Sequence, residues 1–187
     1  LSNSSINTIK KLEKLSGKKI NFFEGDLLDK SLLNSIFKEF NIKNVMHFAA
    51  LKSVEESISN PLSYYKNNVN GTINLLECME SHEVRNIIFS SSATVYGTPA
   101  YLPIDENHKK NPINPYGKTK LHVEQILEDI ANSSSKWKIN CLRYFNPVGS
   151  HPSNILGDSP SGIPSPPQTP HSSKVAHEPS SVVAAAS

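Results

Sequence analysis

The chain has 187 residues, a length that suits one domain or slightly more with a buried apolar core. Its formal net charge of +2 comes from scattered Lys and Arg without a basic block, which disfavours nucleic acid as a partner. Cys78 and Cys141 lack CxxC spacing and the seven histidines lack metal-ligand spacing, so no metal is expected and a reducing cytoplasm fits best. No apolar run approaches the ~20 residues of a membrane-spanning helix, which disfavours a membrane partner.

The first part of the chain predicts two helices and two strands. Apolar residues recur at helical spacing over residues 6–15 and stop at Gly17, which tolerates the left-handed turn that closes a helix. Ile20 to Glu24 is typical of a short strand, and residues 32–40 carry the apolar stripe of a second helix. The apolar run Val45 to Ala50 is short and predicts a buried strand.

The second part continues the alternation. A long helix is predicted from Pro61 to about Met79, followed by a strand over Ile87 to Ser91. Asn114-Pro115 provides an N-cap and a first-turn proline for a helix that runs to about Ala131, and Ile139 to Phe145 predicts the last strand. Strands that alternate with helices indicate an α/β fold with a parallel, doubly wound, Rossmann-like sheet.

The composition changes near Ser159. Residues 159–187 hold six of the 13 prolines, many serines and no aromatic residue, so we expect a disordered low-complexity tail there. Pro167 to Pro170 matches PxxP, but a role as an adaptor ligand is the least favoured interpretation.

Two segments contain residues suited to catalysis. Ser90 to Ser92 lie at the carboxyl end of a predicted strand, where open α/β sheets bind ligands. Tyr116 and Lys120 lie four residues apart at the start of a predicted helix and share one face. A free tyrosine is a poor base near neutrality, but a neighbouring cation favours the phenolate, so Tyr116 is a candidate general base.

Three longer motifs carry a family resemblance: residues 47–52 (HFAALK), residues 90–97 (SSSATVYG) and residues 143–149 (RYFNPVG). With Tyr116 and Lys120, the chain from Leu1 to about Pro164 resembles the extended branch of the short-chain dehydrogenase/reductase superfamily, and within it the UDP-glucose 4-epimerase family. Sugar-nucleotide 4,6-dehydratases of this branch are similar too, but they carry an Asp-Glu pair where this chain has Ala93 and Thr94. Epimerisation is therefore favoured over elimination.

The resemblance implies bound NAD and an interconversion of UDP-glucose and UDP-galactose through a transient 4-keto sugar, as part of galactose metabolism. Tyr116 would remove the proton of the sugar 4-hydroxyl, Lys120 would also hold the nicotinamide ribose, and Ser92 would hold the sugar hydroxyl. The remaining implied cofactor contacts are Asp26, Leu27, Phe48, Ala49, Ala50, Leu51, Lys52, Asn67, Ser92 and Phe145. The implied substrate contacts are Lys52, Ser92, Ala93, Thr94, Tyr116 and Asn146.

The chain departs from the family pattern at several points. Its eight glycines contain no GxGxxG loop, so we expect the first βαβ unit to be missing. The Ser/Pro-rich residues after Pro164 do not match the family, so we expect the carboxyl-terminal substrate domain to be missing too. Ala50 also replaces a glycine common in the family. We therefore predict a partial NAD-binding domain over residues 1–158 and expect this polypeptide alone to be inactive or marginally folded.

Two alternatives to the UDP-glucose 4-epimerase stay open. The family's helices over 61–79 and 115–131 imply a homodimer, so the chain could be a noncatalytic product that binds the full-length enzyme. The chain could also be an epimerase for N-acetylated UDP-hexoses.

Overall fold

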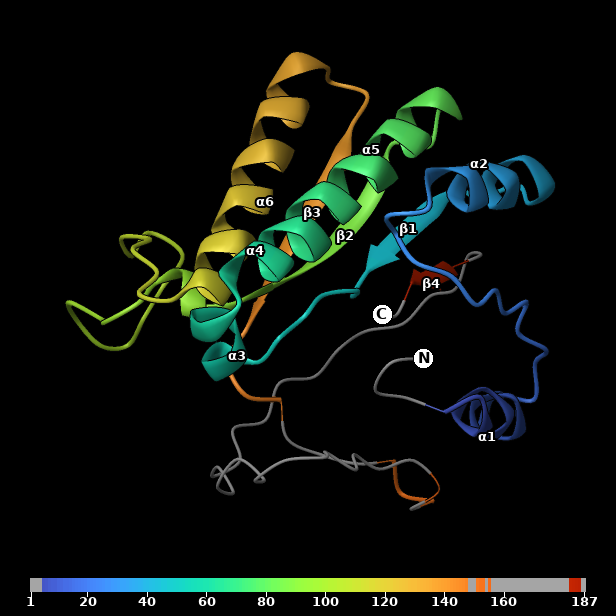
Figure 1. Ribbon diagram of the computed structural model, residues 1–187, viewed down its shortest axis with the longest axis horizontal. Coiled ribbons are helices and arrows are strands. Elements are labelled where there is room, and N and C mark those ends of the chain that lie inside the picture. The colour runs from blue at the N-terminus through green and yellow to red at the C-terminus, as the bar shows by residue number, and fades with distance from the viewer. Residues whose placement is uncertain (1–4, 148–150, 154, 156–181, 186–187) are drawn as a thin grey trace. The chain divides into compact units, whose positions relative to one another are not determined.

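The computed structural model of the chain describes residues 5–147, 151–153, 155 and 182–185. The chain forms two compact units, of which the first comprises residues 1–24 and 146–178 and the second residues 25–145 and 179–187. The second unit contains the sheet and the helices that pack on it (Figure 1). Among the described residues, no helix has both the length and the apolar character needed to cross a membrane.

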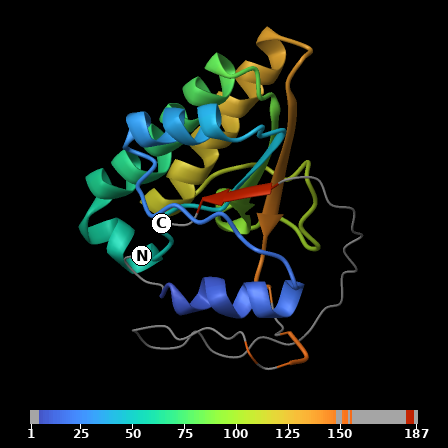
Figure 2. The same cartoon turned by 90° about the vertical axis from the view of Figure 1, so that its right-hand side faces the viewer.

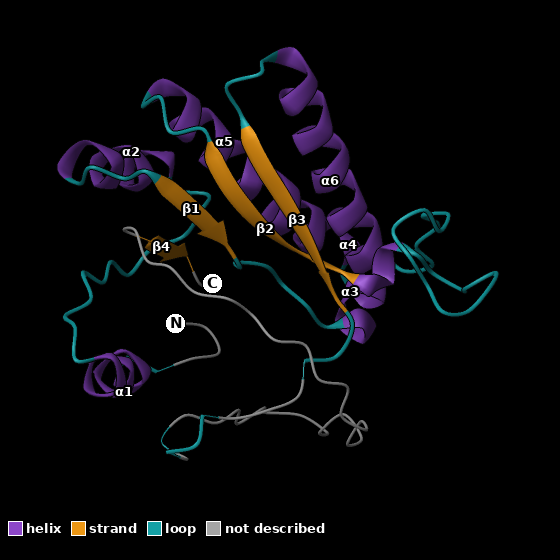
Figure 3. Ribbon diagram, turned by 180° about the vertical axis from the view of Figure 1, so that it is seen from behind, coloured by secondary structure: helices purple, strands orange, loops and turns teal. Residues whose placement is uncertain are grey.

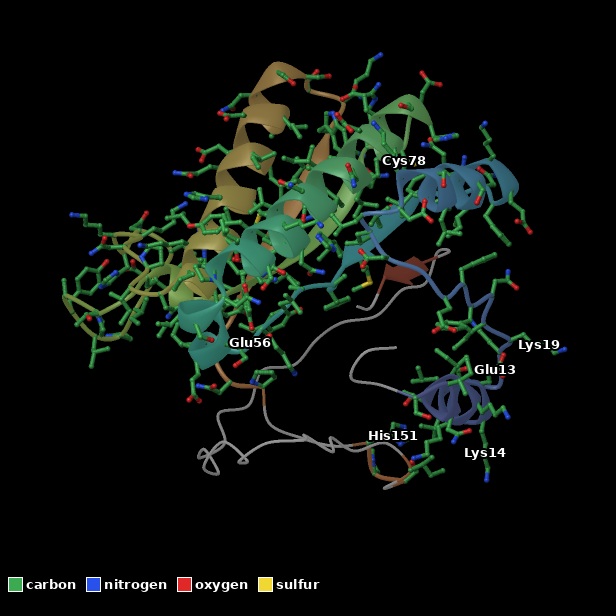
Figure 4. The ribbon with its side chains drawn as sticks, in the orientation of Figure 1. Glu13, Lys14, Lys19, Glu56, Cys78 and His151 are labelled. Atoms are coloured by element: carbon green, nitrogen blue, oxygen red, sulfur yellow. The ribbon has the colours of Figure 1, made fainter. Side chains whose placement is uncertain are left out.

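In the first unit, α1 spans Asn7–Ser16 and confirms the predicted helix. Gly17 has φ 67° and donates its backbone N–H to the Glu13 carbonyl, as expected of a left-handed C-cap. The strand predicted for Ile20 to Glu24 is wrong, because no sheet pairing of the described residues includes this segment. The N–H of Ile20 instead donates to a Glu13 carboxylate oxygen at 2.9 Å, which ties the segment to α1 (Figure 4 labels Glu13).

The second unit contains a parallel sheet of β1 (Asn44–His47), β2 (Asn86–Ser92), β3 (Lys138–Tyr144) and β4 (Val182–Ala185), in the order β3-β2-β1-β4 (Figure 3). The parallel α/β prediction is confirmed, although β1 ends at His47 and not at Ala50.

The tail prediction is wrong for Val182–Ala185, which pairs with β1 in the register Asn44↔Val182. The two valines of the segment favour strand structure, and the edge of β1 is free to pair with it. The rest of 159–187, including the PxxP motif, lies outside the described residues.

The helices of the second unit follow the predicted order with one addition. Asp29 caps α2 (Lys30–Glu39), and an unpredicted short helix, α3, spans Val54–Ser59. The predicted helix from Pro61 is a continuous run of α4 (Pro61–Tyr64), the π-helical segment η1 (Tyr65–Asn70) and α5 (Gly71–Ser81). α6 spans Pro115–Ser133. Figures 1 and 3 show α5 and α6 lying along the same face of the sheet, and Figure 2 shows this layer from the side.

The hydrophobic core lies between that face of the sheet and the helices. Alternate residues of β2 point into it, as the strand's strictly alternating burial shows. A fully buried Val, Leu, Ile, Phe or Met side chain stabilises the fold by about 1.5–3 kcal/mol. The strands, α5 and α6 contribute Val45, Ile87, Phe89, Leu75, Leu76, Cys78, Met79, Val123 and Leu127. This packing holds α6 over the carboxyl end of β2.

Candidate active site

The hydroxyl of Ser92 lies at the carboxyl end of β2, where the chain turns into the 3-10 helix η2 (Ala93–Val95). Its oxygen accepts the Thr94 backbone N–H at 3.2 Å and the Thr94 hydroxyl at 3.0 Å. Ser92 also interacts with the Tyr116 phenol and lowers the pKa of that phenol. The two Thr94 bonds hold the Ser92 oxygen in place and leave its own proton for a further acceptor.

The start of α6 is built for close approach to this turn. Asn114 caps the helix by accepting the Gly117 N–H at 2.8 Å, and Pro115 occupies the first turn, as predicted. A Cβ on Gly117 would lie 2.9 Å from the Thr94 carbonyl oxygen and 3.0 Å from Pro112 Cβ. Only glycine therefore lets α6 begin against η2, which brings Tyr116 to Ser92.

Lys120 lies one turn further along α6 and is 3% exposed. Its ammonium donates to the Ser90 backbone carbonyl at 2.7 Å and lies 4.8 Å from the centre of the Phe89 ring, and the Tyr116 ring centre is 5.9 Å away. Burial lowers the pKa of Lys120 to about 8.

The acidity of Tyr116 differs from the sequence-based expectation. Burial raises the pKa of the Tyr116 phenol, and the hydrogen bond with Ser92 only partly opposes this effect. The sequence suggests that the neighbouring ammonium favours the phenolate, but desolvation of the ring has the larger effect on the Tyr116 pKa in this structure. The phenol is protonated near neutrality.

One group of the residues predicted to contact the cofactor, Phe48 to Lys52, follows β1 at the edge of the sheet where β2 also ends, because β1 and β2 are parallel. Phe48 to Lys52 continue beyond β1, with Phe48 44% exposed. Asn68 holds this segment: its side chain accepts the Leu51 N–H at 2.8 Å and donates to the Leu51 carbonyl at 3.0 Å. It also donates to the Thr119 hydroxyl of α6 at 3.1 Å. Asn68 therefore connects the segment after β1 to the helix that carries Tyr116.

His47, the last residue of β1, is 1% exposed and neutral. Burial, aided by the charge of Lys120, lowers its pKa to about 3. The Thr72 hydroxyl donates to the Asn68 carbonyl, so it accepts from His47 Nε2 over 2.7 Å. His47 Nδ1 is then a buried acceptor with no hydrogen-bond partner among the described residues. Such an atom at a strand end is suited to a bound polar group or water.

The other predicted site residues are more scattered. Asp26 is exposed, and its carboxylate accepts the Leu28 N–H at 2.9 Å, which makes a local turn. Leu27 lies against Gly71 at the start of α5, and Asn67 is half-buried in η1. Phe145 is 56% exposed and stacks on Tyr96 at 6.4 Å. Asn146 belongs to the first unit, and its side chain is exposed.

Sequence reasoning missed three residues that hold the site together: Asn68, Tyr96 and Glu124. Buried Glu124 accepts hydrogen bonds from Ser91 and Arg143, and Arg143 donates in turn to the Tyr96 hydroxyl. A signal for Glu124 was present, because it lies four residues beyond Lys120 on the same helix face.

Comparisons with known proteins agree with this geometry. A family model described as GDP-mannose 4,6 dehydratase matches residues 1–158. A UDP-glucose 4-epimerase of Dictyostelium discoideum is 50% identical over 164 residues, which are 88% of this chain and 48% of that protein. The crystal structure of a UDP-glucose 4-epimerase from Bifidobacterium longum with NAD+ and UDP matches with a TM-score of 0.84 and 49% identity, covering 87% of this chain and 49% of that one. A UDP-Glc/GlcNAc 4-epimerase from Campylobacter jejuni matches at 39% identity and a TM-score of 0.73, over 78% and 44% of the two chains.

The parallel sheet and the Ser92, Tyr116 and Lys120 arrangement at its edge define a Rossmann-like protein of the short-chain dehydrogenase/reductase type. The chain belongs to the family whose model is described as GDP-mannose 4,6 dehydratase. It spans about half the length of the curated relatives it matches.

Proposed function

We propose that this chain carries the catalytic part of an NAD-dependent UDP-glucose 4-epimerase, which interconverts UDP-glucose and UDP-galactose. The observation that carries the proposal is the close approach of the turn after Ser92 to the start of α6, which carries Tyr116 and, one turn further, buried Lys120. Identities of about 50% to proteins named UDP-glucose 4-epimerase support the choice of reaction.

The residues at the edge of the sheet fit NAD on the nicotinamide side. Lys120 uses one N–H for the Ser90 carbonyl, and its other two are available for the nicotinamide ribose. The exposed ring of Phe48 provides an apolar face nearby. When bound, NAD supplies the acceptor and donor for the hydride of the sugar C4. We assign the further contacts to Asp26, Leu27, Ala49, Ala50, Leu51, Lys52, Asn67 and Phe145.

Tyr116 is the group we assign to proton transfer at the sugar 4-hydroxyl. For oxidation Tyr116 first gives its own proton to solvent, and the phenolate then removes the hydroxyl proton as C4 becomes a ketone; in the reverse direction the phenol returns the proton. Ser92 orients the same sugar hydroxyl. The Ser92 oxygen accepts both Thr94 hydrogen bonds, so the Ser92 proton can be donated to another group. Because one group serves both directions, a separate acid is not needed. Lys52, Ala93, Thr94 and Asn146 complete the proposed substrate contacts.

Epimerisation is favoured over dehydration by the residues after Ser92. Loss of water across C5 and C6 of a hexose needs an acid and a base at those carbons. Ala93 offers neither, and the Thr94 hydroxyl is engaged with Ser92. The position that would need carboxylates therefore holds none, which supports chemistry confined to C4.

A second candidate substrate is an N-acetylated UDP-hexose. The match to the Campylobacter jejuni UDP-Glc/GlcNAc 4-epimerase supports considering it. Parallel assays with UDP-galactose and UDP-N-acetylgalactosamine separate the two, because activity only on the acetylated sugar would overturn the first choice.

We also propose that α5 and α6 form a self-association surface, either in a homodimer or in a noncatalytic complex with an intact enzyme. A groove beside these helices has the apolar lining residues Ile73, Leu76, Ile126 and Ile130 and the polar lining residues Lys30, Glu77, Glu80 and Ser81. Ile73 is 37% exposed. Sedimentation of the chain with and without Ile126→Asp tests this.

The proposed setting is the cytoplasm, which the two free thiols of Cys78 and Cys141 support. Residues 1–158 are the proposed epimerase part, and 159–187 the tail.

The test of the proposed reaction uses the whole chain and a chimera. In the chimera, residues 1–158 replace the matching segment of the Dictyostelium discoideum relative. Each is incubated with NAD and UDP-galactose, and UDP-glucose is followed by proton NMR. The chimera should convert the sugar, and its Tyr116→Phe variant should lose at least about 1,000-fold in rate. A folded chimera that binds UDP-galactose without converting it would overturn the proposal.

A further inference from the structure

One face of α6 carries three residues in a row, at Tyr116, Lys120 and Glu124. Residues four apart lie one above the other on a helix, so all three point toward the sheet. Glu124 is 5% exposed, which is unusual for a carboxylate unless it is paired. The role proposed above for Tyr116 and Lys120 leaves this buried charge without an explanation.

The Glu124 carboxylate connects three elements. One oxygen accepts the Ser91 hydroxyl of β2 at 2.6 Å and Arg143 Nε of β3 at 2.8 Å. The other accepts an Arg143 terminal nitrogen at 2.8 Å and lies 3.4 Å from the Lys110 ammonium. This bidentate pairing of Arg143 with Glu124 offsets the cost of burying the two charges. Because both hydrogen bonds need a set geometry, the pairing also fixes the relative orientation of the two side chains. α6 is therefore held in a defined position against both strands.

The consequences extend to the catalytic groups. Ser91 directly precedes Ser92, so the Glu124 bond to Ser91 fixes α6 against the strand that carries the catalytic hydroxyl. Arg143 also donates to the Tyr96 hydroxyl at 2.7 Å, and buried Tyr96 follows η2. A helix free to slide along the sheet would separate Tyr116 from Ser92.

We infer that Glu124 is a positioning residue: by holding Ser91 and Arg143 together, it sets the register of α6 against β2 and thereby the contact between Tyr116 and Ser92. Its catalytic significance rests on the proposed function. The structural claim does not, and it can be tested without cofactor or substrate.

The reporter is Lys120, which lies between Tyr116 and Glu124 and is followed by NMR of 15N-labelled lysine side chains, with Lys120→Arg as the assignment control. Its ammonium is faced by Tyr116 from α6 and by neutral His47 from β1. If Glu124→Gln only removes a negative charge, the pKa of Lys120 falls further below 8. If the variant also lets α6 move away from β2, water reaches Lys120 and its pKa rises toward 10.5. The two explanations thus differ in sign.

We expect the pKa of Lys120 in Glu124→Gln to rise above about 9. Ser91→Ala removes one bond and leaves the Arg143 pair intact, so it should show a smaller rise and remains informative if the first variant does not fold. Glu77→Gln is the matched control, because Glu77 pairs with Lys30 on the surface, where both side chains are about half exposed. It should leave the Lys120 titration unchanged.

Amide hydrogen exchange in α5 separates positioning from general loosening. The proposal expects faster exchange in residues 116–124 and unchanged exchange in α5. It is overturned by an unchanged or lower pKa of Lys120 in folded Glu124→Gln, or by equal loss of protection in both helices. Failure of the chimera to epimerise UDP-hexoses would leave these outcomes untouched, so the two proposals fail separately.

Discussion

The Lys120 ammonium donates to the Ser90 backbone carbonyl over 2.7 Å in a setting that is almost completely buried. A buried charge in that position destabilises the fold, a cost that is common for groups kept for a function. The lowered pKa of Lys120 expresses this conflict.

Lys120→Met should therefore stabilise the chain at pH 7 by about 1–3 kcal/mol, while removing activity in the chimera. The folded pKa of about 8 lies below the unfolded value of 10.5, so the native chain gains stability as pH rises from 8 to 10.5. The advantage of the variant should shrink across that window. Urea unfolding at pH 7 and 10 measures it, with exposed Lys118→Met as control. A variant less stable than the native chain at pH 7 would contradict this reasoning.

His47 should make the fold sensitive to acid. Its folded pKa of about 3 lies below the unfolded 6.5, so the unfolded chain binds an extra proton between these values and stability falls as pH drops below 6.5. His47→Gln should flatten the fall between pH 6.5 and 5, since the buried carboxylate Glu124 has a lowered pKa and contributes only at more acid pH. Exposed His122→Gln should leave the curve unchanged. Equal slopes in all three proteins would refute the role of His47.

Gly117 should tolerate no side chain. The Cβ of Gly117→Ala would press on backbone at Thr94, which cannot move aside as a flexible side chain can. Overpacking of this kind costs about 1–3 kcal/mol, even though alanine favours helices. Gly71→Ala is the matched control, because its Cβ would meet only the Leu27 side chain at 3.1 Å. Thermal unfolding compares the two, and a Gly117→Ala chain as stable as the control would show that the approach is not tight.

Replacing Asn68 should lower the free energy of unfolding more than replacing an exposed asparagine nearby. Asn68→Ala leaves the N–H and carbonyl of part-buried Leu51 without their side-chain partner, at a total cost of about 1–3 kcal/mol. Urea unfolding should show this loss, and amide exchange should quicken in residues 48–52. Exposed Asn70→Ala is the control. If both variants unfold at the same urea concentration, Asn68 does not hold that segment.

Local pattern is sufficient to predict much of this fold. Apolar periodicity and capping residues place α6 and its N-cap Asn114 correctly, and the serines at the end of β2 lie where a parallel sheet presents ligands. Pairing is less accessible to sequence reasoning. Ile20 to Glu24 has strand composition without a neighbouring strand, and Val182–Ala185 forms β4 because the edge of β1 lies beside it.

The supporting groups of the site are predictable only in part. The bonds from Glu124 to Ser91 and to Arg143 join residues 33 and 19 positions apart, and they exist only once α6 lies on the sheet. The pKa of Tyr116 depends on the same burial. The sequence suggested a lowered pKa for Tyr116, whereas burial raises it. The spacing of Tyr116 and Lys120 reveals the nearby charge but not how deeply the phenol is buried.

The central claim is that Ser92, Tyr116 and Lys120 serve reversible oxidation at C4 of a UDP-hexose. The most direct measurement supplies the chimera with NAD and UDP-galactose deuterated at C4, and follows the label by mass spectrometry and NMR. The account predicts UDP-glucose that retains deuterium at C4, because the hydride returns to the carbon it left. Product with solvent hydrogen at C4, or conversion equal to that of Tyr116→Phe, would contradict it.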